Sequence, residues 1–449
     1  MNTTDFAAGL TADRRAILRA TGLAFAAYLA AGCRPGRVSA AVTKASPYGP
    51  LRSDPAGVLD LPEGFSYQVI SRLGDPMDDG GTVPDCADGM GCFALANGQI
   101  VLVRNHELKA HHDGGGNIPS GFDSNDAGRI LPGGTTTLVL DPATLAVKRQ
   151  YRSLAGTIRN CAGGVTPWGS WLSCEEDVTL AGKGVARDHG WIFEVPADAS
   201  GLVDAQPLKA MGRFNHEAAA VDPATGYVYL TEDRDDGLLY RFIPAIPGKL
   251  TAGGRLQALG FANGHEPDTR NWGKTGAGVA AGRQYPLRWI DLDNVESPDD
   301  DLRKRGAAAG AALFARGEGI HVGERELYFC CTSGGASRLG QIFRLSLGKA
   351  GERLQLFFES TAPDEFNYGD NLAVAPNGHL MVCEDQYTDV VDNHLRGITP
   401  DGTAYPLARL RMQTELAGVC HSPDGKVLFL NIFRPTMTLA IRGPWIGQG

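Results

Sequence analysis

The 449-residue sequence predicts an all-β protein, and within that class a β-propeller. Long helical periodicity is scarce, whereas short apolar runs are numerous. The chain contains 59 glycines and 26 prolines, which separate these runs and mark the turns between them. Representative runs are Gln99–Val103, Thr136–Leu140, Tyr227–Leu230 and Lys426–Leu430.

Turns of similar composition recur between the predicted strands. Most of them start at a proline and end near a residue that tolerates a positive φ angle. The turns are Asp141–Thr144, Asp222–Gly226, Ala375–Gly378 and Ser422–Gly425. This unit of two strands joined by such a turn repeats along the chain. Repetition of this kind is typical of a propeller, in which each blade repeats one small sheet around an axis. The repeats are irregular, so an array of β-sandwiches is the alternative.

Polar and acidic residues follow the second strand of successive pairs. These strand ends are Asn105–Glu107, Glu175–Asp177, Glu232–Asp233, Thr332–Gly335 and Glu384–Asp385. Corresponding strands of successive blades surround the axis, so we expect these side chains to converge at one end of it. Carboxylates that lie so close repel one another and need a compensating charge, which bound cations supply. Taken singly, each acid is better explained as a solvated turn residue, but the set as a whole is not.

The segment Asn160–Asp177 adds a cysteine to this pattern. Cys161 precedes a short aromatic and apolar strand that ends in three consecutive acids. A thiolate suits a transition metal, whereas carboxylates suit calcium or ferric iron. The mixture therefore indicates an iron-containing or mixed metal centre. The alternative is a buried structural cysteine beside a solvated acidic loop.

The N-terminus has the order of a Tat export signal. Asp13–Arg19 contains paired arginines, and Ala20–Ala31 is an alanine-rich apolar stretch too short to span a bilayer comfortably. We therefore assign residues 1–40 to a signal peptide with a short linker and residues 41–449 to a single propeller domain. Export by the Tat machinery would place the protein in the periplasm or outside the cell. Cys33 follows small residues, so lipidation there is a second possibility.

The composition limits the choice of partners. A net charge of −9 argues against nucleic acid and against an anionic membrane surface. No other long apolar run follows the signal segment, so we expect no stable membrane span and a monomeric protein acting on a small molecule.

The chain resembles the PhoX-type alkaline phosphatases from about Pro62 to the Gly443–Trp445 ending. The motifs that carry the resemblance are Pro84–Met90, Arg104–Glu107, Asn160–Gly164 with Glu176, Asn215–Glu217, Ala315–Gly319, Asp370–Leu372 with Glu384–Asp385, and Ser422–Gly425. The resemblance implies a Tat-exported β-propeller of six blades with inserted loops. It also implies hydrolysis of phosphomonoesters with a pair of ferric ions (Fe3+), bridged in part by a cysteine thiolate, and with calcium ions (Ca2+) beside them.

The resemblance also assigns roles to residues. Cys161 would be the bridging thiolate of the catalytic centre, and Glu176 and Glu217 would bind iron. Glu318 would bind calcium, and Arg316 would hold the substrate phosphate. The resemblance implies that at least one of Glu232 and Asp233 is a further metal ligand, and the sequence does not show which. It also implies that Glu384 and Asp385 bind calcium.

The sequence departs from the family pattern in two ways. It carries Gly317 where the family's motif tends toward proline, and it lacks length that larger members have. The first difference could make the orientation of the Arg316 side chain less fixed. The second could widen the entrance to the substrate site.

These roles are chemically consistent with phosphate ester hydrolysis. A phosphomonoester dianion needs charge neutralisation, and the planar fork of an arginine matches two phosphate oxygens. Cations lower the pKa of a bound water or oxo species and stabilise the attacking and leaving oxygens. The rival hypotheses are a calcium-dependent propeller lactonase or phytase-like hydrolase, and a noncatalytic calcium-binding propeller. Neither rival has a use for Cys161. We expect His106, His189, His216 and His421 to be structural.

Overall fold

A computed structural model describes residues 45–265, 267–273, 278–347, 351–386 and 388–447. Thr43–Gly449 form one compact unit. The predicted signal segment and Cys33 lie outside the described residues. The helical elements that the structure describes are α2 (Leu302–Ala308) and the 3-10 turns η1 (Lys209–Met211) and η2 (Leu250–Ala252). None of these described helices has the length and apolar character that a membrane crossing requires.

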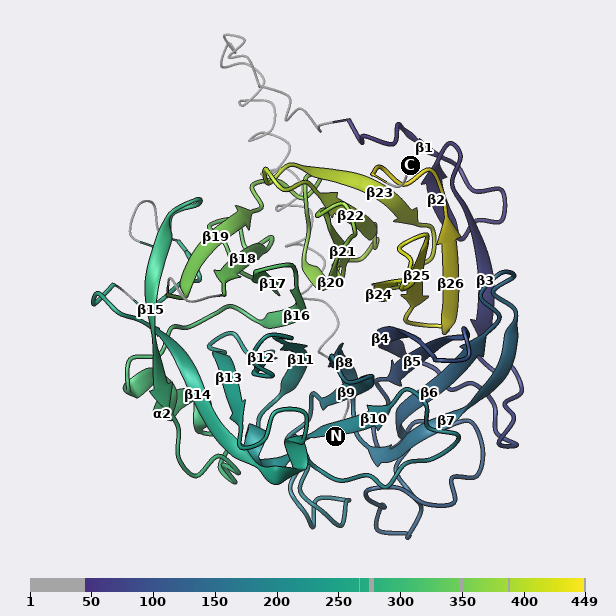
Figure 1. Cartoon of the computed structure of the whole chain (residues 1–449), viewed down its shortest axis with the longest axis horizontal. Helices are drawn as coiled ribbons and strands as arrows, with labels where there is room; N and C mark the ends of the chain where they lie inside the picture. The colour runs from purple at the N-terminus through teal and green to yellow at the C-terminus, as the bar shows by residue number, and fades with distance from the viewer. Residues whose placement is uncertain (1–44, 266, 274–277, 348–350, 387, 448–449) are drawn as a thin grey trace, which may run out of the picture. The chain divides into compact units, whose positions relative to one another are not determined.

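The described strands form six antiparallel meanders around a central axis (Figure 1). The first three are β4 (Ala87–Ala94), β5 (Ile100–His106), β6 (Gly133–Leu140) and β7 (Val147–Thr157); β8 (Asn160–Val165), β9 (Ser170–Glu175) and β10 (Ile192–Pro196); and β11 (His216–Val221), β12 (Val228–Glu232), β13 (Leu239–Pro244) and β14 (Gly254–Phe261). The other three are β16 (Gly317–Val322), β17 (Glu326–Cys331), β18 (Gln341–Ser346) and β19 (Arg353–Glu359); β20 (Gly369–Val374), β21 (Leu380–Glu384), β22 (His394–Ile398) and β23 (Ala404–Leu410); and β24 (Leu416–His421), β25 (Val427–Ile432) and β26 (Met437–Arg442). Strand β15 (Gln284–Asp291) pairs with both β14 and β19.

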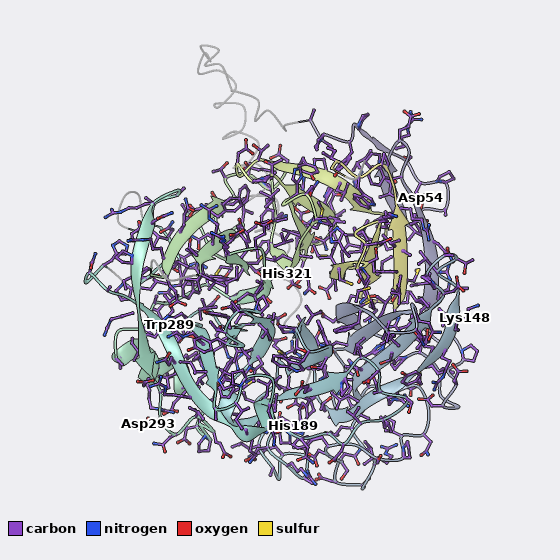
Figure 2. All side chains as sticks on the ribbon, viewed as in Figure 1. Asp54, Lys148, His189, Trp289, Asp293 and His321 are labelled. Carbon is purple, nitrogen blue, oxygen red and sulfur yellow. The ribbon has the colours of Figure 1, made fainter. Side chains whose placement is uncertain are left out.

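The first strand of each meander lies closest to the axis. These strands contact one another in the closed order β4, β8, β11, β16, β20, β24 and again β4. Figure 2 shows His321, from β16, near the middle of the ring, whereas Lys148 from β7 lies toward its outside. Meanders in a closed ring are the architecture of a β-propeller, so the predicted fold class is confirmed.

Small residues allow the first strands to approach one another closely. A Cβ atom on Gly164 would lie 1.9 Å from the carbonyl oxygen of Ala219 on the neighbouring first strand. A Cβ atom on Gly89 would lie 2.5 Å from the Cα atom of Ala162. Glycine is therefore required at both positions because the adjacent backbone occupies the space of a side chain.

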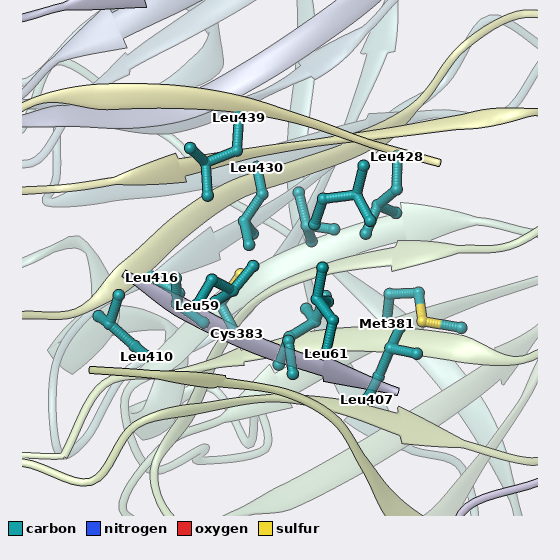
Figure 3. Close-up of a cluster of buried hydrophobic side chains, with 14 of the residues drawn as sticks. Leu59, Leu61, Met381, Cys383, Leu407, Leu410, Leu416, Leu428, Leu430 and Leu439 are labelled. Carbon is teal, nitrogen blue, oxygen red and sulfur yellow. The ribbon is translucent and has the colours of Figure 1, made fainter. Parts of the chain in front are cut away.

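The N-terminal strands close the ring by joining the C-terminal meanders. Strand β3 (Ser66–Arg72) pairs with β26, and strand β2 (Leu59–Pro62) pairs with β23 and with β1 (Leu51–Arg52). Leu59 and Leu61 from β2 pack in a buried cluster with leucines of β23 to β26, including Leu439 (Figure 3). Similar apolar clusters contain residues of other neighbouring meanders. The first and last parts of the described chain are thus held together by both hydrogen bonds and apolar burial.

Each first strand carries the same irregularity near its start. The pairing with the second strand shifts register within the first few residues, as a β-bulge does. The shifts lie between Ala87 and Met90, Asn160 and Gly163, His216 and Ala219, Gly317 and Ile320, Gly369 and Leu372, and Ala417 and Cys420. A bulge re-aims the side chains at its position, so all six meanders present their second residue in an equivalent way.

A repeated backbone hydrogen bond fixes the neighbouring residues as well. In every meander, the residue that follows the second strand donates its N–H to the carbonyl of the residue that precedes the first strand. The pairs are Glu107 to Cys86, Glu176 to Arg159, Asp233 to Asn215, Thr332 to Arg316, Asp385 to Tyr368, and Phe433 to Glu415. One end of the axis is therefore built from six copies of one backbone arrangement that carry different side chains.

The ring closure makes a testable contribution to stability. Leu439 pairs with Val69 of β3 and is fully buried. Leu439→Ala should lower the free energy of unfolding by about 2–5 kcal/mol, because it leaves a cavity in the closing cluster. Urea denaturation followed by tryptophan fluorescence measures this change. The exposed Leu73 is the control, and Leu73→Ala should stay within about 0.5 kcal/mol of the parent. Equal effects of the two substitutions would contradict a stabilising closure.

Candidate metal centre

Five of the six first strands place a potential metal ligand at their second position. The strand β24 has Ala417 there. The ligands are Asp88, Cys161, Glu217, Glu318 and Asp370, and all five are buried. Since the bulge orients this position equivalently in each strand, the five side chains come together from five different meanders.

The residues that follow the second strands add a further set of acids. Thr332 occupies the corresponding position after β17 and Phe433 after β25. The acids are Glu107, Glu176, Asp233 and Asp385. The predicted convergence of these strand ends is therefore what the structure shows.

The two sets form three adjacent groups of possible ligands. The first is Asp88 with Glu107 and Cys161, the second is Cys161 with Glu176 and Glu217, and the third is Glu217 with Glu318 and Asp370. Within each group, the ligand atoms lie within 4.8 Å of one another. Cys161 belongs to two groups and Glu217 also belongs to two. We call these seven residues the candidate centre.

Glu217 provides the strongest sign that the candidate centre holds cations. It is fully buried, and neither of its carboxylate oxygens has a hydrogen-bond partner among the described residues. Oδ1 of Asp88 is likewise buried without a partner in the described part of the chain. Buried polar groups are almost always satisfied, so these oxygens fit a group that the protein itself does not supply.

The electrostatics of the candidate centre agree with this interpretation. Burial raises the pKa of Glu217 well above its ordinary value, and the carboxyl groups of Glu318 and Asp370 raise it further. Burial also raises the pKa of the Cys161 thiol, with a second contribution from the negative charge of Asp88. The Cys161 Sγ lies 3.6 Å from Asp88 Oδ2. Ionised carboxylates and a thiolate can coexist here only with strong positive charge beside them. Thiolate and carboxylate donors together suit iron, and the all-oxygen third group suits calcium.

Two arginines flank the candidate centre at equivalent positions before their first strands. Arg316 binds Asp233 through Nε at 2.8 Å and Nη2 at 3.1 Å, and Nη2 also lies 2.9 Å from Glu318. Arg159 binds Glu107 at 2.6 Å and also Glu176. Arg316 has φ 55° and Arg159 has φ 48°, in the left-handed region. Such conformations cost about 1–2 kcal/mol in residues other than glycine and mark positions that the surrounding structure enforces.

Four predicted ligands lie outside the candidate centre, and two of them, Glu232 and Glu384, bond to structural partners instead. Glu232 Oε2 accepts hydrogen bonds from Tyr240 at 2.7 Å and from the backbone of Leu238 at 3.3 Å. Glu384 accepts from the backbones of Asn367 and His394 and from Arg396 Nε, all within 2.9 Å. Both glutamates end their second strands, and the side chain of the next residue points the other way.

Neither Glu232 nor Glu384 belongs to one of the three ligand groups, and the contacts of both are those of structural residues. Of the pair that the sequence left open, Asp233 is the residue beside Glu318, through their shared contact with Arg316. Asp385 interacts electrostatically with both Asp370 and Arg316, so it borders the candidate centre.

The other side chains considered from the sequence have structural partners. His189 bridges Glu175 at 2.7 Å and Asp123 at 3.1 Å. His106 bonds Thr136, and His216 bonds the carbonyl of Gly212. These contacts hold loops and strands together, as predicted for these three histidines, whereas Nδ1 of His421 is buried without a hydrogen-bond partner among the described residues. Cys174 lies fully buried in an apolar cluster.

The comparisons with known proteins identify the family. A model of the alkaline phosphatase PhoX family matches residues 46–144 and 123–436. The chain belongs to the PhoX family. It is accordingly an enzyme of the phosphatase class. No curated protein sequence matches the chain significantly.

One solved structure supports the fold of this PhoX family member. PhoX of Pseudomonas fluorescens, determined in complex with vanadate as a transition state analogue, aligns with a TM-score of 0.67 and 19% sequence identity. The alignment covers 86% of this chain and 96% of that one. A gluconolactonase from Xanthomonas campestris aligns with a TM-score of 0.43 and 13% identity, over 89% of this chain and 99% of that one.

The sequence interpretation did not assign Asp88, Glu107 and Asp370, although each lies in a PhoX motif. A signal for Asp88 and Asp370 exists in the sequence. Each is an acid near the start of a strand and is followed by glycine or asparagine, as Glu318 is followed by Gly319. Asp88 and Asp370 become visible when the starts of the first strands are aligned with one another. Alignment of the ends of the second strands does not reveal them.

The candidate centre predicts how pH acts on this PhoX protein when it is stripped of metal. Burial and the charge of Asp385 raise the pKa of Asp370 from 3.8 to about 7. The pKa of Asp370 is higher in the folded chain than in the unfolded chain. The contribution of Asp370 to folding stability is therefore complete below pH 3.8 and is lost as the pH rises through 7. Thermal unfolding after chelation should therefore occur at lower temperature at pH 8 than at pH 5.

The variant Asp370→Asn should reduce this pH dependence, because asparagine does not titrate. Asp198→Asn, on the exposed surface, is the matched control and should retain the full pH dependence. A metal-free protein that is more stable at pH 8 than at pH 5 would contradict the proposed charge repulsion.

Proposed function

We propose that the chain is an exported, metal-dependent alkaline phosphatase that hydrolyses phosphomonoesters and releases inorganic phosphate. The observation that carries the proposal is the linkage of three ligand groups through Cys161 and Glu217. A phosphomonoester dianion needs several positive charges around one phosphorus atom, and linked groups can supply them at one place. Membership in the PhoX family supports the same reaction.

We assign the ligand groups by donor chemistry. The two groups that share Cys161 would hold iron, with Glu176 and Glu217 as carboxylate ligands. The all-oxygen group of Glu217, Glu318 and Asp370 would hold calcium. Bound cations there would neutralise the phosphate and lower the pKa of a bound water.

The protein's own contribution to phosphate binding would be Arg316. Asp233 fixes the guanidinium through two hydrogen bonds, so the group is already oriented. Among the described residues, Nη1 of Arg316 has no hydrogen-bond partner. The two N–H groups of that nitrogen would donate to phosphate oxygens. Arg316 would thus orient the phosphoryl group while Glu318, two residues later, holds a cation.

Export rests on the sequence of the N-terminal segment. The twin-arginine pattern in Asp13–Arg19 and the apolar stretch Ala20–Ala31 support transport by the Tat machinery to the periplasm or beyond. Cys33 would serve as a lipid anchor only if the small residues before it are recognised as a lipobox.

The proposal is tested by replacing the thiolate. Cys161→Ser keeps the size of the side chain but removes the soft ligand, so iron content should fall below about a tenth of the parent. Hydrolysis of p-nitrophenyl phosphate should fall by at least about 100-fold, because the charge that neutralises the phosphate is lost. Elemental analysis and initial rates measure these changes.

Cys174→Ser is the matched control. Cys174 lies in the same meander but in an apolar cluster, so its replacement should leave iron and rate within about twofold of the parent. Calcium without iron in the parent protein would favour a calcium-dependent lactonase or phytase-like hydrolase, or a noncatalytic propeller. Full activity with iron retained in Cys161→Ser would rule out the assignment of the thiolate.

The role of Arg316 predicts a specific effect of Arg316→Lys. Lysine keeps the charge but loses the planar fork, so the inhibition constant of inorganic phosphate should rise about tenfold while iron and calcium contents stay unchanged. Steady-state inhibition and elemental analysis measure both quantities. If Arg316 served only as an ion-pair partner of Asp233 and Glu318, calcium affinity would change instead and phosphate inhibition would persist.

A further inference from the structure

A cavity of about 470 Å³ opens beside the candidate centre. Its lining includes Glu107, a member of the candidate centre, and Arg159 and Asp385, which border the centre. A volume of this size suits a small organic group. The leaving group of a phosphomonoester held at the candidate centre would therefore extend into this cavity.

One wall of the cavity is cationic. It is formed by Lys109, His112 and Arg434, and we call it the cationic wall. Lys109 is exposed and makes no ion pair among the described residues. Its backbone N–H donates to Nδ1 of His112 at 3.3 Å, so the loop holds the two side chains near each other.

Arg434 is fixed in the cationic wall by its own contacts. Its Nε lies 3.0 Å from Asp85, and its Nη2 lies 2.9 Å from the Cys86 sulfur. The guanidinium is half exposed, so part of it faces solvent. Asp85 also accepts a hydrogen bond from the backbone of Thr436, which anchors the loop that carries Arg434.

The charges of the cationic wall are those of Lys109 and Arg434, whereas His112 is a neutral ring whose Nδ1 accepts the Lys109 N–H. Burial, the ring of His111, and the charges of Arg434 and Lys109 lower the pKa of His112. Like charges gathered at the mouth of a cavity produce a local positive potential that attracts anions. The acids of the candidate centre lie on another part of the same cavity and would be neutralised by its cations.

We propose that the cationic wall is a subsite for a second anionic group on the leaving alcohol of the substrate. The proposal rests on the proposed function and narrows its substrate class to phosphomonoesters whose alcohol carries a carboxylate or a second phosphate. The phosphoryl group lies at the candidate centre, and the second anion lies against Lys109, His112 and Arg434.

Two pairs of esters test the proposal. Glycerol 3-phosphate and 3-phosphoglycerate have the same carbon chain, but only the second has a carboxylate. Fructose 6-phosphate and fructose 1,6-bisphosphate differ by one phosphate. The ratio of kcat/KM within each pair should favour the ester with the second anion by about three- to tenfold at low salt. The preference should weaken as ionic strength rises.

The double variant Lys109→Gln/His112→Gln removes the lysine charge and the histidine ring of the cationic wall and leaves Arg434 with Asp85. The ratios should fall toward one, and calorimetric binding of glycerate should weaken by the same factor. Lys183→Gln is the matched control, because Lys183 is exposed and does not line the cavity. It should leave the ratios unchanged. Thermal unfolding of each variant checks that the fold is intact.

The outcomes separate this proposal from the proposed function. Hydrolysis of p-nitrophenyl phosphate with ratios near one in both pairs would overturn the cationic wall as a subsite and leave the phosphatase standing. Ratios that stay high in a folded double variant would also overturn it. Loss of preference for one pair only would identify the anion, carboxylate or phosphate, that the cationic wall binds. No hydrolysis of any ester by metal-replete protein would overturn the proposed function and this proposal together.

Discussion

The concentration of acidic groups in a buried place is the constraint on which the rest of the structure depends. Asp88, Glu217, Glu318 and Asp370 are almost completely removed from water, and Cys161 lies among them. Ionised groups in such a place repel one another strongly, since the low-dielectric surroundings screen little of the repulsion. A flexible chain would relieve the repulsion by moving apart. The fold has to prevent that movement until cations neutralise the charge.

Two features of the fold oppose the repulsion. The apolar clusters between meanders hold the first strands in a closed ring, and glycine at positions such as Gly164 lets those strands touch. The arginines provide a second restraint. Arg159 and Arg316 tether acids that follow the second strands, and Arg316 also bonds Glu318, while no described cationic side chain bonds the two oxygens of Glu217. The acids at the rim are thus paired internally, whereas both oxygens of Glu217 are left for ligands from outside the chain.

The sequence predicted the architecture because a propeller is built from one local unit of strands and turns that repeats along the chain. Short strands, proline-started turns and acids at strand ends can all be found without knowing how distant segments meet. The sequence did not show in the same way which of two neighbouring acids faces the axis. Glu232 and Asp233 are adjacent, and whether a side chain faces the axis or the neighbouring strand depends on pairing register, which a shift of one residue reverses. Glu384 and Asp385 pose the same problem. The bulges that orient Asp88 and Asp370 also leave no compositional trace beyond a small following residue.

The ring closure has a consequence for the order of events during biosynthesis. Strand β3 is among the first described strands to be synthesised, and its partner β26 is the last of them. Asp88 and Asp370, which both belong to the candidate centre, are separated by most of the domain. A ribosome-bound chain therefore lacks the enclosure that brings these groups together until its C-terminal strands emerge. If the candidate centre holds metals, as proposed, stable loading of all three ligand groups would follow synthesis of β26.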